Sequence, residues 1–173
     1  MNRRDFETLS LTLESTPVLL ARAAAAFPPG CERVRPAAGG FSFLENVWHL
    51  ADLEREAYGE RIRRLIEEDN PSLPNFDGDR MARERAYQER ELDRGLAAFA
   101  RARARNLETL RKMGRREWKR SGNQEGVGRI ALADLPRMMA DHDRSHAADI
   151  ANLIAAIRGG TELDRPCPSS AVA

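Results

Sequence analysis

Two of the chain's three histidines, His142 and His146, lie four residues apart near its C-terminal end. On an α-helix this spacing places both imidazoles on one face, with Cβ atoms about 5–6 Å apart. Two imidazoles so placed can bind one metal ion. The apolar residues of segment 135–157 fall on the same side of the helical wheel, so we expect both histidines to point into the core.

The third histidine, His49, lies far upstream in the segment FSFLENVWHLADLE. On a helical wheel it has leucines on one side and Glu45, Asp52 and Glu56 on the other. We therefore expect His49 at the edge of a cleft with carboxylates beside it. Its approach to the other two histidines depends on the fold.

Three neutral imidazoles are good ligands for a first-row transition metal, and a site with three protein ligands stays open to water or substrate. A metal so held can lower the pKa of a bound water to about 7, or keep a thiol as its thiolate. Either would supply a nucleophile without a nucleophilic side chain. The spacings alone leave a second interpretation open, in which the histidines are satisfied core residues.

Helical periodicity of apolar residues predicts the elements that must position these histidines. Ser42 and Glu45 form a capping-box pattern at the start of the second helix, and Gly159-Gly160 ends the last one. Thr16-Pro17 leaves the first helix either kinked or in two pieces. The predicted helices span residues 5–26, 42–69, 81–113 and 133–158, with a loop or short hairpin over 114–131.

Four helices with one inward stripe each predict an all-α four-helix bundle. We expect one domain over residues 1–158 and a mobile tail over 159–173, with a core large enough to need no disulfide. Cys31 and Cys167 have no framework spacing and are interpreted as free thiols. The sequence contains neither a long apolar run nor a signal-peptide pattern, so we expect a cytoplasmic protein without a membrane anchor.

The charge pattern gives little support to a nucleic-acid partner. The net charge is +1, and the one basic stretch, Arg101 to Arg120, has nine Lys or Arg against two Glu. Its basic residues lie on all sides of the predicted helix, and Trp118 is its one aromatic residue. We therefore expect no binding to nucleic acid.

The order of elements and several local motifs resemble the DinB-like (YfiT-like, DinB_2 type) superfamily of metal-dependent enzymes. The resemblance covers about residues 5–158, and its most specific part is a His followed, some 90 residues later, by His-x-x-x-His. The matching residues are Gly40, Phe41, Ser42, Glu45, His49, Leu50, Asp52, Asn75, Phe76, Asp77, Phe99, Arg103, Leu107, Leu110, Gly126, Leu135, His142, Asp143 and His146.

This resemblance implies a four-helix bundle in which His49, His142 and His146 hold a divalent ion, zinc or nickel foremost, often in a homodimer. It also implies chemistry on a small molecule, in some relatives through a low-molecular-weight thiol such as bacillithiol or mycothiol. All three histidines are present here. The resemblance therefore predicts a member that keeps its metal.

Arg103 falls on the inward face of its predicted helix and has two interpretations. It could bind a carboxylate of a substrate or thiol cofactor, or it could form an ion pair with a carboxylate such as Glu54 or Glu56. The sequence does not choose between them.

Three carboxylates are further candidates for a role beside the metal. Asp149 lies one turn after His146 and could orient that imidazole or assist a bound water, or it could be a solvated surface residue. Glu45 is a capping residue first and a candidate base second. Asp52 is a candidate for a contact that orients a ligand.

Two functions follow from these residues and from the family resemblance, and the resemblance alone favours the thiol route within the first. The first is an enzyme in which a metal-activated thiolate attacks a small electrophile, or in which metal-activated water hydrolyses a small molecule. The second is a non-catalytic homodimeric bundle whose metal is structural or senses a ligand. A fourth protein ligand would favour the second function, because structural zinc sites are closed.

Overall fold

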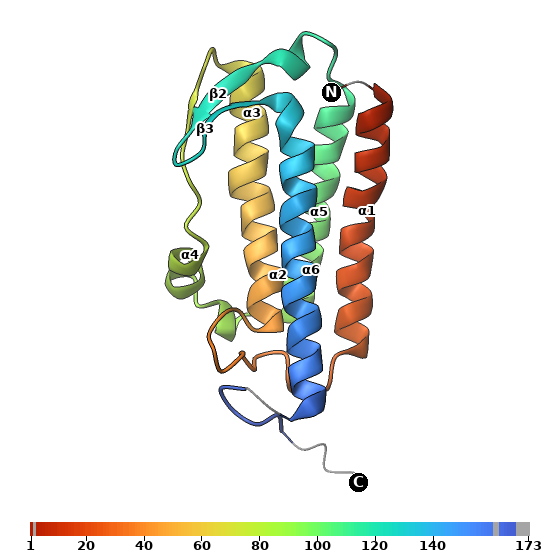
Figure 1. Cartoon of the computed structure of the whole chain (residues 1–173), viewed down its shortest axis with the longest axis vertical. Coiled ribbons are helices and arrows are strands. Elements are labelled where there is room, and N and C mark those ends of the chain that lie inside the picture. Colours follow the sequence, from red (N-terminus) through yellow and green to blue (C-terminus); the bar gives the residue numbers. More distant parts are fainter. Residues whose placement is uncertain (2, 161–162, 169–173) are drawn as a thin grey trace.

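The computed structural model describes residues 1, 3–160 and 163–168. Within these residues four long helical segments lie side by side (Figure 1). They are α1 (Arg3–Ala26), the segment that begins with α2 (Phe43–Asp52), α5 (Leu92–Arg111) and α6 (Leu135–Gly159). Both α1 and α2 pack against α5 and α6, so the predicted four-helix bundle is confirmed.

The helix that carries His49 begins with the predicted capping box. The Ser42 side chain accepts a hydrogen bond from the Glu45 N–H, and the Glu45 carboxylate accepts one from the Ser42 N–H at 2.9 Å. After α2 the helix continues through a π-helical segment, Leu53–Tyr58, into α3 (Gly59–Glu67). The predicted helix over 42–69 is therefore confirmed, with a wider turn in its middle that the periodicity does not reveal.

Helix α1 runs without a break through Pro17, which settles the alternative that the sequence left open. Proline has no N–H, so the carbonyl of Leu13, four residues earlier, lacks its helical partner. Arg103 of α5 donates a hydrogen bond to that carbonyl at 3.0 Å. The proline thus creates an acceptor that a neighbouring helix uses.

The predicted continuous helix over 81–113 is wrong. Two helices replace it: a short α4 (Gly78–Glu84), capped by Asp77, and α5, with a 3₁₀ turn between them. The break occurs at Ala86, whose φ of 47° is incompatible with a right-handed helix. The Tyr87 hydroxyl donates to Asp52 at 2.7 Å, and this long-range contact holds the turn against α2.

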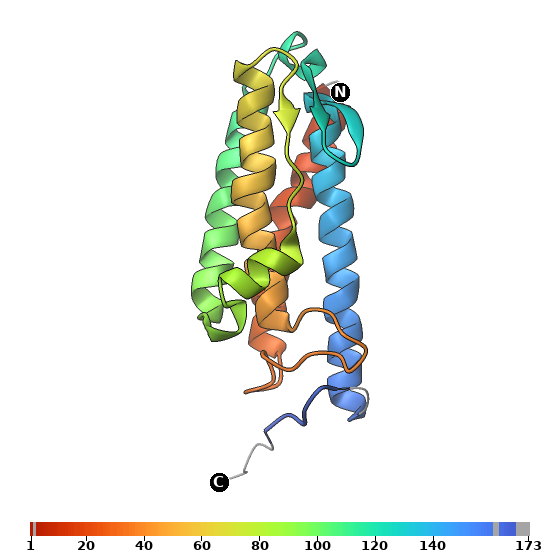
Figure 2. The ribbon, with the colours of Figure 1, turned by 90° about the vertical axis from the view of Figure 1, so that its left-hand side faces the viewer.

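Three short strands in the described part of the chain lie near one end of the bundle, the hairpin in Figure 1 and the third strand in Figure 2. They are β1 (Ser72–Leu73), β2 (Ser121–Gln124) and β3 (Gly128–Ala131). Strand β2 pairs antiparallel with β3, Ser121 opposite Ala131, and parallel with β1. The hairpin that the loop 114–131 suggested is therefore present.

Apolar side chains of the described residues form two clusters, one toward each end of the bundle. Leu65, Leu107 and Leu135 belong to the cluster near the strands, while Phe99 and Leu153 belong to the other. The buried residues Arg103 and Asp143 lie between these two sets in the sequence. His49 and Glu54, also buried, lie within three residues of Asp52, where one set gives way to the other. The bundle thus contains a polar layer at mid-length. None of the described helices is both long and apolar enough to span a membrane.

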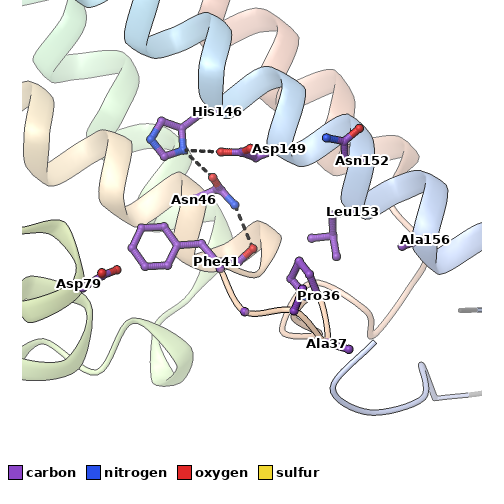
Figure 3. A pocket seen from close by; sticks show the side chains of 13 residues that line it. Pro36, Ala37, Phe41, Asn46, Asp79, His146, Asp149, Asn152, Leu153 and Ala156 are labelled. Atoms are coloured by element: carbon purple, nitrogen blue, oxygen red, sulfur yellow. Dashed lines mark hydrogen bonds and ion pairs between the residues drawn. The ribbon is translucent and has the colours of Figure 1, made fainter. Parts of the chain in front are cut away.

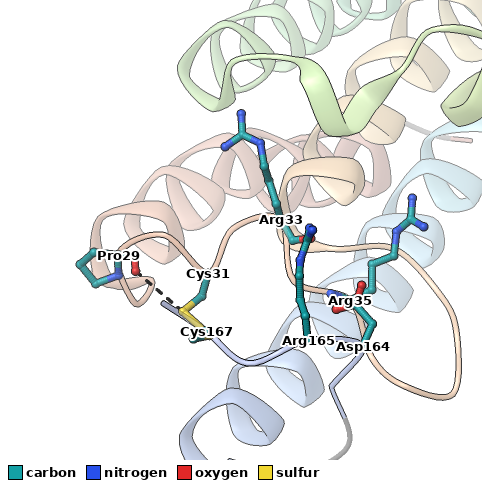
Figure 4. The surroundings of a disulfide bond; sticks show 7 residues. All are labelled: Pro29, Cys31, Arg33, Arg35, Asp164, Arg165 and Cys167. Atoms are coloured by element: carbon teal, nitrogen blue, oxygen red, sulfur yellow. Dashed lines mark hydrogen bonds between the residues drawn. A yellow bond between two sulfur atoms is a disulfide. The ribbon is translucent and has the colours of Figure 1, made fainter. Parts of the chain in front are cut away.

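The prediction of two free thiols is wrong, because Cys31 and Cys167 form a disulfide with Cα atoms 5.1 Å apart (Figure 4). Residues 163–168 return to the loop after α1, where the Arg35 N–H donates to Asp164 at 2.9 Å and the Asp164 N–H donates to the Arg35 carbonyl. The sequence could not show this return. This part of the predicted mobile tail is therefore attached, while residues 161–162 and 169–173 lie outside the described residues.

Candidate metal centre

The fold brings all three histidines together. His49 comes from α2, and His142 and His146 come from α6. The Nε2 atom of His142 lies 3.3 Å from Nε2 of His49 and 3.2 Å from Nε2 of His146. His49 is buried and the other two are half-buried. Three imidazoles thus present the same ring nitrogen to one point.

These separations match those of ligands that share one ion. Imidazole nitrogens lie roughly 2.0–2.1 Å from a tetrahedral zinc ion, which places two such nitrogens about 3.3–3.4 Å apart. Among the residues that the structure describes, no further His, Cys, Asp or Glu joins the group. The donor set is therefore three imidazoles with coordination left open, the arrangement typical of a catalytic rather than a structural zinc site.

The surroundings keep the three imidazoles uncharged. Burial and repulsion from the other two histidines lower the pKa of His49 to about 3. Burial, with repulsion from His146, lowers the pKa of His142 to about 4, and burial lowers the pKa of His146. Neutral imidazole is the form that binds metal, so the site is prepared for a cation at neutral pH.

Asn46 fixes the orientation of His146, as Figure 3 shows. Its Nδ2 donates to the carbonyls of Phe41 and Ser42 at 3.2 and 2.9 Å, so its Oδ1 points away from them. That Oδ1 lies 2.6 Å from Nδ1 of His146 and must accept the imidazole proton there. Nε2 of His146 is thereby left with a free lone pair for a metal. Sequence reasoning missed Asn46, although it lies three residues before His49, on the same side of the helix.

His49 is held by packing rather than by a hydrogen bond at its Nδ1, which is buried without a partner. The first residue of α4, Gly78, lies directly over the ring: a Cβ atom there would be 2.5 Å from Cε1 and 2.6 Å from Nδ1. The rings of Phe41 and Phe76 flank the imidazole at 5.3 and 5.9 Å between centroids. Only glycine leaves room for this contact.

Of the two interpretations of Arg103, the structure shows the ion pair. Its guanidinium donates to both carboxylate oxygens of Asp143 at 2.7 and 2.9 Å and to Glu54 at 3.0 Å. The residue is 1% exposed. No part of it is free for a substrate carboxylate, so the predicted substrate-binding role is not supported. Instead it ties α5 to the residue that follows His142.

The three carboxylates predicted to act beside the metal have different surroundings in the structure. Glu45 accepts from Arg35 at 2.8 Å as well as capping α2, and Asp52 accepts from Tyr87 and from Arg85 at 2.6 Å. Both carboxylates are thus engaged away from the imidazoles, because they bind arginines from the loop before α2 and from the end of α4. Asp149 is exposed, and its Oδ2 lies 4.0 Å from Nδ1 of His146.

A cavity of about 770 Å³ opens beside His146 (Figure 3). It lies between the loop that precedes α2 and the C-terminal half of α6, and its lining residues include Pro36, Phe41, Asn46, Asp79, Asp149 and Leu153. Cavities of this size hold small molecules. Through His146 the histidine cluster therefore borders a space large enough for a substrate.

A family model described as DinB superfamily matches residues 12–150. The chain belongs to the DinB superfamily. Among solved structures, this DinB chain is similar to YfiT from Bacillus subtilis, which is described as a probable metal-dependent hydrolase with an unusual four-helix bundle topology. The two share 21% sequence identity over 93% of this chain and 91% of that chain, with a TM-score of 0.82. No curated protein sequence matches the chain.

The predicted family and the predicted fold are thus confirmed for this DinB chain. At 21% identity the likeness to YfiT establishes the shared fold. The chemistry has to be argued from the residues of this chain.

Proposed function

We propose that this DinB protein binds one divalent transition-metal ion, with zinc and nickel the leading candidates, through His49, His142 and His146, and hydrolyses a small molecule that enters by the adjacent cavity. The observation that carries the proposal is the convergence of the three imidazoles beside that cavity: Nε2 of His142 lies 3.2–3.3 Å from Nε2 of each of the other two, and all three ligand atoms lie within 4.8 Å of one another. The similarity of the chain to YfiT, described as a probable metal-dependent hydrolase, supports the proposal.

A divalent ion held by three imidazoles acts as a Lewis acid and lowers the pKa of coordinated water to about 7. The residues of the chain orient the ligands and accept a proton. Asn46 holds the proton on Nδ1 of His146, and Gly78 and the phenylalanines keep His49 in place. Asp149 borders the cavity and is the predicted carboxylate best placed to accept a proton from water there.

Hydrolysis of an ester or amide consumes one water. The water oxygen bonds to the acyl carbon, the bond to the leaving oxygen or nitrogen breaks, and a water proton passes to the leaving group. No cofactor beyond the metal is required.

Transfer through a low-molecular-weight thiol, which the family resemblance implies, is the competing chemistry. Among the described residues that line the cavity there is neither Lys nor Arg to bind an acidic thiol cofactor, and Arg103 is fully engaged elsewhere. A purely structural metal is disfavoured by the open coordination of the donor set. From the family resemblance we further propose a homodimer.

Metal analysis tests the site. Protein purified without a nickel column should contain about one divalent ion per chain, lost in His142→Ala and kept in Asn152→Ala, a variant at an exposed position of the same helix. A folded protein that binds neither Zn²⁺ nor Ni²⁺ at saturation would overturn the proposal.

The metal-loaded protein is then assayed with ester and amide reporters, and separately with an electrophile plus bacterial thiols. Conjugation without hydrolysis would replace the hydrolase assignment by thiol transfer.

A further inference from the structure

The cavity beside the metal centre has an acidic wall. Asp79, in the first turn of α4, and Asp149, on α6, both line it, with the ring of Phe41 between them in Figure 3. Within the described residues Asp79 forms no ion pair, and Asp149 has only the 4.0 Å approach to His146. No described Lys or Arg therefore forms an ion pair with either carboxylate.

Basic residues lie in a neighbouring hollow instead. Arg35 and Arg83 line that second space, of about 420 Å³, together with three carboxylates, those of Glu45, Asp79 and Glu89. Arg35 is paired there with Glu45. The remaining lining of the main cavity is largely apolar and includes Pro36, Leu153 and Ala156. Of these two spaces, the one that borders His146 has no described Lys or Arg in its lining, whereas the second has both signs of charge.

An ammonium group fits this combination. Carboxylates attract it by charge, and the face of an aromatic ring such as Phe41 attracts it through the ring quadrupole. An anionic group would meet two carboxylates and no described basic side chain. The apolar lining suits a hydrocarbon portion of the same molecule.

We propose that the substrate of this cavity is an amphipathic small molecule that carries a cationic amino group. The ammonium lies between Asp79 and Asp149 over Phe41, and the hydrocarbon part lies against the apolar lining of the cavity. The site is the cavity at the metal centre, and the two carboxylates select the charge of its occupant. The inference rests on the proposed function for the reaction but not for the binding, which can be measured separately.

Binding is measured first, by calorimetry with metal-free and zinc-loaded protein. The probes are hexylammonium, hexanol and hexanoate, which share a chain length and differ in charge. We expect hexylammonium to bind most tightly, by about two- to fivefold for each exposed carboxylate, and the preference to fall as salt rises.

The variants Asp79→Asn and Asp149→Asn should each reduce the ratio of hexylammonium to hexanol affinity by about two- to fivefold. Asp93→Asn, an equal charge change at an exposed position of α5 away from the cavity, should leave the ratio unchanged. Circular dichroism verifies that each variant is folded. Hexanoate binding as tightly as hexylammonium, or a ratio unchanged in both cavity variants, would overturn the inference.

Activity separates this inference from the proposed function. Aminohexanoyl, hexanoyl and carboxypentanoyl esters with one reporter leaving group should be cleaved in that order of kcat/KM. Selective hexylammonium binding without any hydrolysis would refute the hydrolase while keeping the cation site. Hydrolysis that favours the neutral or the anionic ester would refute the cation site while keeping the hydrolase.

Discussion

Replacing Asn46 by alanine tests how the structure prepares His146 for a metal. The amide is 1% exposed, and its Oδ1 lies 2.6 Å from Nδ1 of the imidazole. Alanine removes this acceptor, and the buried position gives water little access to replace it. The imidazole is then free to turn and to carry its proton on either nitrogen, so the lone pair on Nε2 is no longer guaranteed.

The size of the effect follows from this contact. Removing a hydrogen bond that orients a ligand imidazole weakens metal binding by about 10–100-fold, equivalent to about 1.4–2.7 kcal/mol. The free-energy cost of leaving the N–H of a half-buried ring without its hydrogen bond falls within this range. We therefore expect the Kd of Asn46→Ala for Zn²⁺ to exceed that of the unmodified protein at least tenfold.

Competition titration against a chromophoric zinc chelator measures these affinities. Asn152→Ala is the matched control, because Asn152 lines the same cavity and makes no described contact with a histidine. Asn46→Asp keeps an acceptor for the Nδ1 proton, but its second carboxylate oxygen meets the Phe41 and Ser42 carbonyls that the amide bonded. Its zinc affinity should therefore lie between those of Asn46→Ala and the original protein.

Two results would refute this reasoning. One is a folded Asn46→Ala protein with unchanged zinc affinity. The other is a loss of equal size in Asn152→Ala, which would point to a general change of the cavity. Thermal unfolding followed by circular dichroism distinguishes both from a protein that fails to fold.

Three further changes have defined outcomes. Gly78→Ala places a Cβ 2.5 Å from the His49 ring, which must move, so zinc affinity should fall by about tenfold or more, while Arg80→Ala in the same turn leaves it unchanged. Arg103→Met leaves two buried carboxylates without their partner and should lower the free energy of unfolding in urea by about 3–5 kcal/mol. Cys31→Ser, or a dithiol reductant with the original protein, should lower it by about 2–4 kcal/mol, and an unchanged midpoint would contradict the disulfide.

Local patterns predicted the parts of the site that local physics determines. The capping box of Ser42 and Glu45 and the four-residue spacing of His142 and His146 depend on residues within one or two helical turns. The approach of His49 required the bundle as well. Four inward stripes made that bundle the most economical packing, and so its helices could be anticipated.

The missed features all depend on contacts between distant segments. The sequence around Ala86 does not indicate a left-handed backbone conformation, which alanine rarely adopts. The turn there is held by a hydrogen bond from Tyr87 to Asp52. Likewise Gly78 resembles an ordinary turn glycine until the His49 ring is placed beneath it. The Cys31 partner comes from the far end of the chain.

The buried ion pairs at mid-bundle are better explained by the way they position the helices than by a gain in stability. Proteins in which apolar residues replace both members of such a pair are often no less stable. Asp143 on α6 is bound by Arg103 of α5 and by Thr16 of α1 at 2.7 Å, and Arg103 also binds Glu54. These contacts fix the rotation of α6, and a rotation by one residue, about 100°, would turn both of its histidines away from α2. We infer that the network sets the geometry of the metal site. Arg103→Met should then lose zinc affinity as well as stability, whereas a purely stabilising network would leave the affinity of the folded protein unchanged.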